Sequence, residues 1–437
     1  MKLKTLYVCQ ECKAERPKWE GRCNDCGAWN SFVEDVVNVG KPEKSGAILS
    51  PGLRQNTHSI SKEPTKAFRT PTNIGELDRV LGGGIAEGSM ILLAGEPGIG
   101  KSTLTLQIVE RMAQHKERLL YITGEESIDQ VSERARRLNC SSSKLELLYE
   151  NSLENILATV DAHKPDFLVI DSIQVMSSQA IAGTAGSLSQ VRYVTEAIMH
   201  HIKTLGIPTL LIGHVNKEGS IAGPKVLEHL VDTVLLLEGE RDQELRLLRT
   251  LKNRFGAVSE VGLFEMDEEG LKEMINPGQK VLEGRGKNVL GSCLTLSMEG
   301  NRPLLMEIEA LVSTTPFGYP KRAATGFDRN RLELLIAVLQ KHGGLNLADQ
   351  DVYIKVVGGL RLSDPAADLA VCLAIASSLL KKALPANWVA FGEVGLTGKI
   401  NASFRSKTRT ETAERMGLET VNTKMIQELS SLLKALG

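Results

Sequence analysis

The chain has 437 residues, of which 42% are hydrophobic, and this length favours two or three domains with buried cores. Its 52 Lys and Arg residues balance 53 Asp and Glu residues, which gives a formal net charge of -1. This balance excludes nucleic-acid binding through an overall positive surface, so DNA contacts would need a local cluster of cations. Because no run of about eighteen apolar residues occurs and the first residues do not form a secretory signal, we expect a cytoplasmic protein with no membrane partner.

Four cysteines near the start of the chain form two CxxC pairs separated by ten residues: Cys9, Cys12, Cys23 and Cys26. Each pair can direct two thiolates at one point, and two pairs complete a closed tetrahedral zinc site with no open position for catalysis. Disulfides are the alternative, although they are rare in the cytosol. The sequence therefore predicts a zinc-finger module over residues 1–33, with Trp19 and Trp29 packed around the metal.

Residues 34–68 are polar and contain Gly, Pro, Ser and Lys, which predicts a linker. Strand and helix patterns then alternate over residues 69–275. Short apolar runs occur at 90–94, 119–123, 167–170, 209–213 and 233–237. Because helical patterns separate these runs, the sequence predicts an α/β domain whose mostly parallel sheet is covered by helices on both faces.

A glycine-rich segment follows the predicted strand at 90–94 and precedes a helical pattern. Its residues are Gly95, Glu96, Pro97, Gly98, Ile99, Gly100, Lys101 and Ser102, followed by Thr103. The segment fits the phosphate-binding pattern G-x-x-x-x-G-K-[ST], in which backbone N–H groups surround the phosphates of ATP. Lys101 would reach the β- and γ-phosphate oxygens, and Ser102 would bind Mg²⁺. A glycine-rich turn without a ligand is the alternative, which the flanking strand and helix disfavour.

Acidic residues complete a candidate hydrolysis site. The apolar run at 167–170 ends in Asp171, a carboxylate suited to Mg²⁺ beside the phosphate loop. Glu125 and Glu126 follow the neighbouring strand, where one of them can orient or deprotonate the attacking water while the other is a solvated charge. We favour Glu125 as the base.

A second boundary contains Asn276, Pro277 and Gly278, and residues 285–437 form a smaller domain. Apolar residues at 332, 335, 336 and 339 predict one face of a helix, and those at 352, 354 and 356 predict a strand. Residues 366–380 have the composition of a buried helix. The pattern predicts an α+β domain.

Together these segments resemble the bacterial RadA (Sms) family, whose members are relatives of RecA. The resemblance extends along almost the whole chain and includes the four-cysteine unit, the phosphate loop and residues 72–85, 123–127 and 214–232. Its most distinctive signature is Lys-Asn-Arg-Phe-Gly at residues 252–256. The last domain is similar to the proteolytic domain of Lon proteases. The resemblance implies a RecA-like P-loop core between a zinc ribbon and a Lon-protease-like domain.

The resemblance also implies roles for site residues. Glu125 would activate water, and His214 would sense the γ-phosphate. Lys252 and Arg254 would reach the nucleotide of an adjacent subunit in a homo-oligomer, a hexameric ring, where cations supplied in trans stabilise phosphoryl charge. Without the resemblance, Lys252 and Arg254 are best interpreted as solvated charges.

The function that the resemblance implies is an ATP-dependent DNA motor, a translocase or helicase that uses ATP, Mg²⁺ and Zn²⁺. It would act on single-stranded or branched DNA with a RecA-type recombinase, in recombination and repair. Residues 177–189 and 216–225 lie where RecA-like motors place DNA-contacting loops, although loops without a ligand are an equal alternative. A RecA-like signalling ATPase ring that binds protein and an ATP-dependent Lon-type protease remain alternative functions.

Lon-type enzymes use a Ser nucleophile and a Lys base. In the matching segments of this chain those positions hold Ala366 and Arg409. A methyl group cannot attack a carbonyl, and a guanidinium stays protonated, so we expect the last domain to be proteolytically inactive. A basic stretch in the same domain is interpreted either as a DNA-binding surface or as solvated charge: Lys321, Arg322, Arg329 and Arg331.

Overall fold

The computed structural model describes residues 3–9, 14–16, 18–29, 31–38, 69–214, 225–239, 243–286, 288–316, 318–358, 361–422 and 428–431. The chain forms two compact units. The first comprises Met1–Arg241, Arg246–Val258 and Phe264–Glu273, and the second comprises Asp242–Leu245, Ser259–Leu263 and Met274–Gly437. Most of the expected linker lies outside the described residues, so we keep the four-part division into 1–33, 34–68, 69–275 and 285–437 as a proposal.

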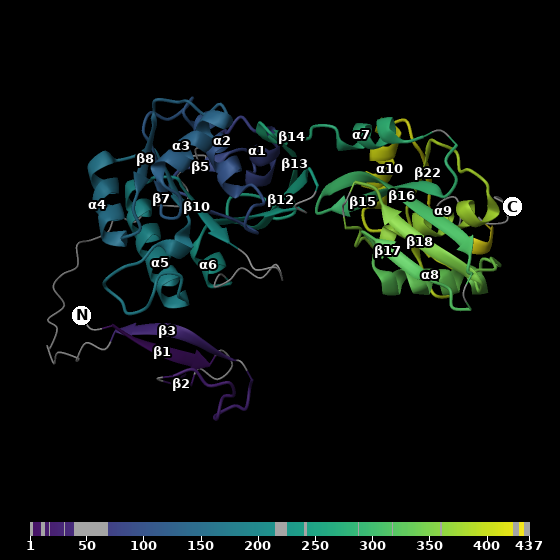
Figure 1. Ribbon diagram of the computed structural model, residues 1–437, viewed down its shortest axis with the longest axis horizontal. Helices are drawn as coiled ribbons and strands as arrows, with labels where there is room; N and C mark the ends of the chain where they lie inside the picture. Colours follow the sequence, from purple (N-terminus) through teal and green to yellow (C-terminus); the bar gives the residue numbers. More distant parts are fainter. Residues whose placement is uncertain are drawn as a thin grey trace, which may run out of the picture. The chain divides into compact units, whose positions relative to one another are not determined.

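The N-terminal segment forms a small antiparallel sheet in the order β2-β1-β3 (Figure 1). Its strands are β1 (Leu3–Cys9), β2 (Glu15–Arg16) and β3 (Phe32–Asn38). Among the described residues of this segment, the core is a cluster of Cys9, Cys23 and Phe32. A domain of this size cannot bury enough apolar surface to be stable unaided, so a bound metal would contribute much of its folding energy.

The first unit is built on a nine-stranded sheet that is parallel through its centre and antiparallel at one side. In spatial order the strands are β14 (Gly270–Glu273), β13 (Val261–Asp267), β12 (Leu245–Asn253), β11 (Thr233–Glu238), β6 (Met90–Gly95), β10 (Thr209–His214), β9 (Phe167–Asp171), β7 (Leu119–Thr123) and β8 (Leu145–Tyr149). A separate pair, β4 (Arg69–Thr70) and β5 (Ile85–Ala86), is antiparallel. The predicted, mostly parallel sheet is confirmed.

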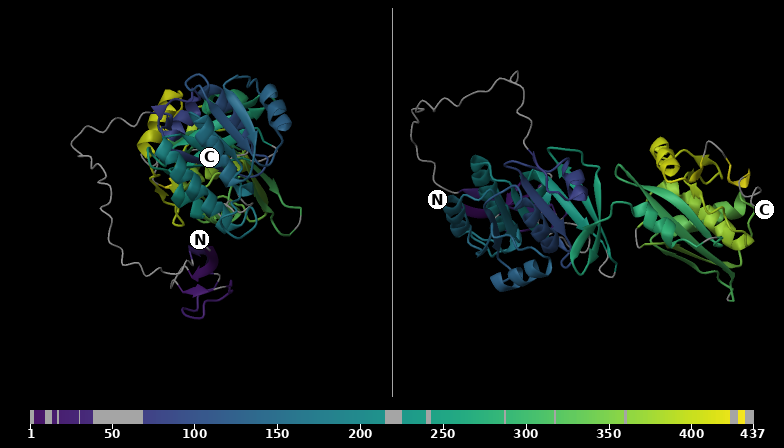
Figure 2. Two further views of the ribbon diagram at one scale, coloured as in Figure 1. Left: turned by 90° about the vertical axis from the view of Figure 1, so that its left-hand side faces the viewer. Right: turned by 90° about the horizontal axis from the view of Figure 1, so that it is seen from above.

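Helices cover both faces of this sheet (Figure 1, Figure 2). They are α1 (Gly75–Leu81), α2 (Lys101–Met112), α3 (Ile128–Arg137), α4 (Leu153–His163), α5 (Leu188–Leu205) and α6 (Lys225–Leu230), with a short 3-10 turn at Ile173–Val175. In β6, Ile91 and Leu93 join the core under α1, α2 and α3, whereas Met90 and Leu92 join the core under α4, α5 and α6. The apolar run of β6 is therefore explained by burial on both faces.

The second unit contains a six-stranded sheet and a two-stranded ribbon. The sheet has the order β17 (Arg322–Thr325), β18 (Gln350–Val356), β16 (Arg302–Thr314), β15 (Ser292–Glu299), β19 (Trp388–Ala390) and β22 (Glu419–Val421), and the ribbon pairs β20 (Glu393–Val394) with β21 (Ile400–Asn401). The helices are α7 (Pro277–Gly284), α8 (Arg329–Lys341), α9 (Asp368–Leu380) and α10 (Ser406–Arg415). The α+β expectation for this region agrees with these elements.

Two details differ from the sequence interpretation. The expected boundary at Asn276–Gly278 contains the start of α7, because Asn276 is the N-cap and Pro277 is the first residue of that helix. The buried helix starts at Asp368 and not at Ala366, since a 3-10 turn at Pro365–Ala367 precedes it. Within the described part of the chain, the length and apolar character that a membrane-spanning helix needs are not found in any helix.

Candidate functional site

The candidate nucleotide loop connects β6 to α2, and its glycines are required by close packing and by backbone conformation. A Cβ on Gly95 would lie 2.7 Å from the carbonyl oxygen of Leu237, and one on Gly100 would lie 2.4 Å from Cε of Met266. Gly98 and Gly100 also have φ values of 81° and 114°, a region that L-residues rarely adopt. The loop thus brings bare backbone to the start of α2, a geometry that suits phosphate.

Lys101 is buried at the base of this loop. Its Nζ donates hydrogen bonds of 2.9 Å to the carbonyl oxygens of Gly95 and Glu96. Burial lowers the pKa of Lys101 to about 8, while the charges of Asp171 and Glu125 act in the opposite direction. A phosphate group would add negative charge beside this amine and stabilise its protonated form.

Asp171 ends β9 beside the loop, and Ser102 of α2 hydrogen-bonds to its carboxylate. Burial raises the pKa of Asp171, whereas the hydrogen bonds from Tyr121 and Ser102 lower it. A hydroxyl and a carboxylate in mutual contact next to a phosphate-binding loop are the oxygen ligands that suit Mg²⁺. The residues present therefore fit a magnesium site between Ser102 and Asp171.

Glu125 and Glu126, which follow β7 after Gly124, have different environments. Ser172 Oγ donates to Glu125 Oε1, and His214 Nε2 lies 3.3 Å from the same oxygen. The hydrogen bond from His214 is the largest influence on Glu125 and lowers its pKa, so this carboxylate is ionised. Glu126 instead accepts two hydrogen bonds, of 2.6 and 2.7 Å, from Arg134. Glu126 is therefore held by an ion pair and is not the solvated charge expected from the sequence.

Local structure fixes this pair of carboxylates. Ser127 caps α3 by accepting a hydrogen bond from the Gln130 backbone, and the Gln130 side chain accepts one from the backbone N–H of Ser127. This reciprocal box starts the helix directly after Glu126.

His214 ends β10 and pairs in register with Gly95 of β6, so the last residues of both strands lie at the same edge of the sheet.

The structure does not bring Lys252 and Arg254 to this edge. Lys252 pairs in register with Val234 at the start of β11, whereas Gly95 pairs with Leu237 near the end of that strand. Lys252 Nζ donates to carbonyl oxygens at and just after the end of α6, those of Glu228 (2.6 Å), His229 (3.5 Å) and Val231 (2.8 Å). Burial lowers its pKa. The two cations thus lie at the opposite end of the parallel strands from the nucleotide loop of their own chain.

Arg254 differs from Lys252 in its exposure. Its guanidinium is 3.8 Å from Asp232, and its side chain is 54% exposed. A cation so exposed can contact another molecule without losing a buried interaction. The structure therefore gathers four of the six predicted catalytic residues: Lys101, Glu125, Asp171 and His214. Lys252 on β12 and Arg254, just past the end of that strand, lie apart from them.

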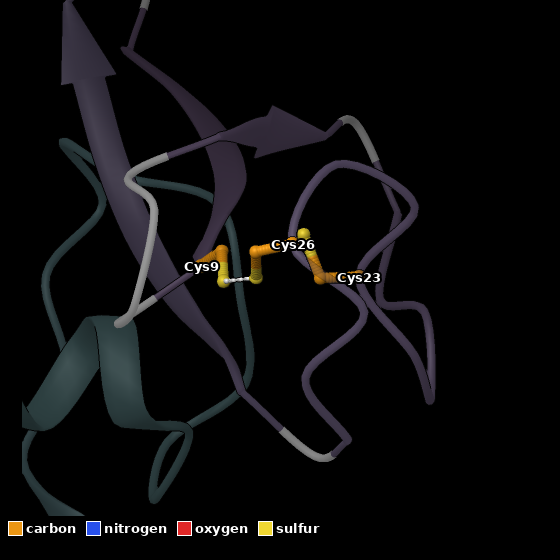
Figure 3. Close-up of side chains that lie close together, drawn as sticks. All are labelled: Cys9, Cys23 and Cys26. Atoms are coloured by element: carbon orange, nitrogen blue, oxygen red, sulfur yellow. Dashed lines mark hydrogen bonds between the residues drawn. The ribbon is translucent and has the colours of Figure 1, made fainter.

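The N-terminal cysteines form a candidate metal centre (Figure 3). Sγ of Cys9 lies 3.6 Å from Sγ of Cys26, and the sulfurs of Cys9, Cys23 and Cys26 all lie within 4.8 Å of one another. Zinc–sulfur bonds of about 2.3 Å in a tetrahedron place sulfurs about 3.8 Å apart, so the three thiols fit zinc. Cys12, the expected fourth ligand, lies outside the described residues.

The tryptophan interpretation was wrong. Trp19 is 54% exposed and Trp29 is 72% exposed, so their side chains face outward instead of covering the metal. Arg22 lies over the Trp29 ring at 5.6 Å. The spacing of the cysteines does not reveal which way these indoles face.

The two expected DNA loops have different outcomes. The loop at 177–189 is organised around Gln190, which is buried and bonds to the backbone of Ser178, Ile181 and Gly183. Residues 182–186 are exposed. DNA contact by this loop stays a prediction. In the second loop, 216–225, residues 216–224 lie outside the described residues, and Lys225 starts α6.

The two positions expected to match the Lon catalytic residues, 366 and 409, hold side chains that are buried in the fold. Ala366 is buried, and the Arg409 side chain is 0% exposed. Arg409 donates to Asp364 (2.6 Å), to the carbonyl oxygen of Phe404 (3.0 Å) and to that of Leu296. A guanidinium that is fully engaged and always protonated cannot serve as a general base.

The predicted basic surface of the second unit needs correction. Arg331 forms an ion pair with buried Asp368 at 2.5 and 2.6 Å, and Arg322 donates to the backbone carbonyl oxygens of Leu347 and Gln350. Their charges stabilise the fold and are not displayed together. Arg329 is exposed and lies 3.0 Å from Glu333, and Lys321 is exposed over the Tyr353 ring. DNA binding by this stretch stays a prediction.

Sequence reasoning missed two hydroxyl groups of the site. Ser172 directly follows Asp171, and Tyr121 is the one aromatic residue in the aliphatic strand β7. A polar group in a strand that is buried on both faces needs a hydrogen-bonding partner. The sequence could have indicated these hydroxyl groups through that requirement, although the requirement does not identify the partner.

Comparisons with known proteins agree with these two sites. Residues 70–156 match an ATPase family described as KaiC, and residues 7–34 match the rubredoxin metal binding domain. The DNA repair protein RadA of Bacillus subtilis is 46% identical over 420 residues, which cover 96% of this chain and 92% of that protein. The DNA repair protein RadA of Rickettsia felis is 43% identical, over 98% of this chain and 95% of that protein. Among solved structures, a KaiC-like protein from Pyrococcus horikoshii is 22% identical, with a TM-score of 0.40 over 48% of this chain and 99% of its own.

Proposed function

The chain belongs to the RadA family of DNA repair proteins, and from that membership we propose that it is an ATP-driven motor that translocates on single-stranded or branched DNA. The family and the RecA-like ATPase fold support a DNA repair protein that hydrolyses ATP. Migration of branches and processing of recombination intermediates beside a RecA-type recombinase are the finer part of the proposal.

The proposed hydrolysis site contains the gathered residues. The loop backbone and Lys101 would hold the phosphates, and Lys101 would exchange its bonds to Gly95 and Glu96 for phosphate oxygens. Mg²⁺ bound by Ser102 and Asp171 would neutralise charge on the β- and γ-phosphates. Glu125 would accept a proton from the water that attacks the γ-phosphorus, while the bond to the ADP oxygen breaks.

His214 links this chemistry to the rest of the fold. Its Nε2 faces Glu125, and its Nδ1 is buried without a hydrogen-bond partner among the described residues. The two ring nitrogens can bond to different groups, so the ring can contact Glu125 through Nε2 and a γ-phosphate through Nδ1. We assign His214 to sensing the γ-phosphate, and through it the strand β10 responds to hydrolysis.

Lys252 and Arg254 are assigned to the nucleotide of an adjacent subunit. The support is their place at the end of the sheet opposite the nucleotide loop, together with the exposure of Arg254. Cations supplied in trans couple hydrolysis to assembly, which favours a closed homo-oligomer, a hexamer in this proposal. The N-terminal module is assigned a zinc ion and contact with a protein partner, and the second unit is assigned a scaffolding role without proteolysis.

One observation carries the proposal: Glu125 is held by Ser172 and His214 beside Lys101 and Asp171, as an ionised base next to a phosphate-binding loop. The test is ATP hydrolysis by the full chain with Mg²⁺, with and without single-stranded DNA. We expect activity that DNA increases and that Lys101→Ala abolishes. Hydrolysis unchanged by DNA would favour a signalling ATPase that binds protein, and full activity of Lys101→Ala would reject the site.

A further inference from the structure

Tyr121 lies in the middle of β7 with 0% of its surface exposed. Side chains alternate along a strand, so Tyr121 shares a face with Leu119 and Thr123. On the adjacent parallel strand β9, Tyr121 pairs with Val169, and Thr123 pairs with Asp171. The phenol and the carboxylate therefore stand on one face of the sheet, two residues apart along the strands.

The Tyr121 hydroxyl spans this distance. It donates a hydrogen bond of 2.5 Å to Asp171 Oδ2, and both groups are buried. A carboxylate oxygen accepts hydrogen bonds, so the phenolic O–H is the donor in this pair.

The tyrosine ring is fixed on its other side by the hydrophobic core. Tyr121 belongs to the core under α1, α2 and α3, together with Leu104 and Leu106 of the helix that follows the nucleotide loop. The hydroxyl of a buried tyrosine usually finds a hydrogen-bond partner, and any main-chain carbonyl would satisfy that need. Here the partner is the carboxylate at the end of β9, which also contacts Ser102. A rigid ring thus sets the rotation of a carboxylate that faces the phosphate loop.

We propose that Tyr121 is a positioning residue that orients Asp171 for Mg²⁺. This inference rests on the proposed function in one respect, the assignment of Asp171 as a metal ligand. Groups that hydrogen-bond to metal ligands hold them in the binding geometry, and their loss typically weakens metal affinity about tenfold or more. Without the phenol, the Asp171 carboxylate can rotate and must be reoriented at each binding event. The role of Tyr121 is separate from nucleotide contact because its side chain is enclosed by protein.

The test is Tyr121→Phe, which removes one oxygen and keeps the ring in the core. The affinity of the full chain for a fluorescent ATP analogue is measured over a series of Mg²⁺ concentrations, without DNA, and again with the metal chelated. We expect a rise of about tenfold in the Mg²⁺ concentration that gives half of the metal-dependent increase in nucleotide affinity. The nucleotide affinity without metal should stay unchanged. Tyr193→Phe is the matched control, because Tyr193 is a partly buried tyrosine of α5 that packs against the opposite core.

A double-mutant cycle with Asp171→Asn separates positioning from packing. If Tyr121 acts through Asp171, Tyr121→Phe has little further effect on Mg²⁺ dependence once the carboxylate is gone. An equal effect in both backgrounds, or an unchanged Mg²⁺ dependence in Tyr121→Phe with only a lower unfolding temperature, would overturn the proposal. Failure of the motor hypothesis is distinguishable, because this titration requires neither DNA nor turnover.

Discussion

Arg134 holds the carboxylate of Glu126 through two hydrogen bonds, of 2.6 and 2.7 Å. This bidentate ion pair distinguishes two adjacent glutamates that sequence alone treats as equivalent. Glu126 is directed toward α3, while its neighbour Glu125 faces His214 and Ser172. The difference leads directly to the first prediction.

Glu125→Gln is expected to lower kcat for ATP hydrolysis by about 100-fold or more, because an amide cannot accept the proton of the attacking water. Glu126→Gln keeps the same shape and loses only a partly exposed ion pair, so its kcat is expected to stay within about twofold of the parent. Single-turnover rates at saturating Mg²⁺ and ATP measure both. The reverse order of effects would assign the base to Glu126.

His214→Gln is expected to shift the pH dependence of hydrolysis. The hydrogen bond from His214 lowers the pKa of Glu125 below its usual range. Removing it raises that pKa, so a smaller fraction of Glu125 is ionised at a given acidic pH. The acidic limb of the kcat–pH profile therefore moves to higher pH. His201→Gln, which changes an imidazole that lies 2.8 Å from Asp161 on the helical surface, should leave the limb in place.

Arg254→Ala subunits mixed with Lys101→Ala subunits are expected to hydrolyse more ATP than the sum of the two separate preparations. Each variant retains the half of the site that the other lacks, so some interfaces in a mixed assembly are complete. Size-exclusion chromatography must first show that both variants assemble as the parent does. Mixtures that never exceed the sum would remove the support for action in trans.

Cys9→Ser or Cys26→Ser is expected to release zinc and unfold the N-terminal module. The cluster of Cys9, Cys23 and Phe32 is too small to hold that module together without metal. Nucleotide affinity of the ATPase unit should change by less than about twofold, since the phosphate loop and its helices have their own cores. Metal analysis of protein expressed with ample zinc provides the measurement. Intact cysteines without bound zinc would contradict the metal assignment.

Arg409→Met is expected to destabilise the second unit by about 3 kcal/mol, because it leaves Asp364 and two carbonyl oxygens without their buried donor. Lys407→Ala is the control, since the Lys407 side chain is 91% exposed. Urea denaturation of both variants measures the difference.

Ala366→Ser is expected not to create proteolytic activity, because Arg409 remains where a Lys base would be needed. Cleavage of an unfolded substrate protein by this variant would refute the assignment of an inactive protease.

Much of the ATPase fold could be predicted, because it depends on local signals. The run at 90–94, the positive-φ glycines Gly98 and Gly100 and the acid at the end of β9 each leave a signal within a short stretch of sequence. The contacts that refine the site depend on neighbours distant in sequence. Tyr121 and Asp171 are 50 residues apart, and Arg331 and Asp368 are 37 residues apart. Only strand order and helix packing bring such groups together, and periodicity does not encode these partners.

Lys252 and Gly95 pair with opposite ends of β11, and this separation has a consequence for the number of complete sites in an assembly. If Lys252 and Arg254 serve a neighbour, each chain carries two half-sites that its own sheet keeps from meeting. An open row of subunits then always has one complete site fewer than it has chains, whereas a closed ring has as many sites as chains. Hydrolysis per chain would accordingly fall as the protein is diluted below its assembly concentration, even though every loop remains intact and able to bind ATP.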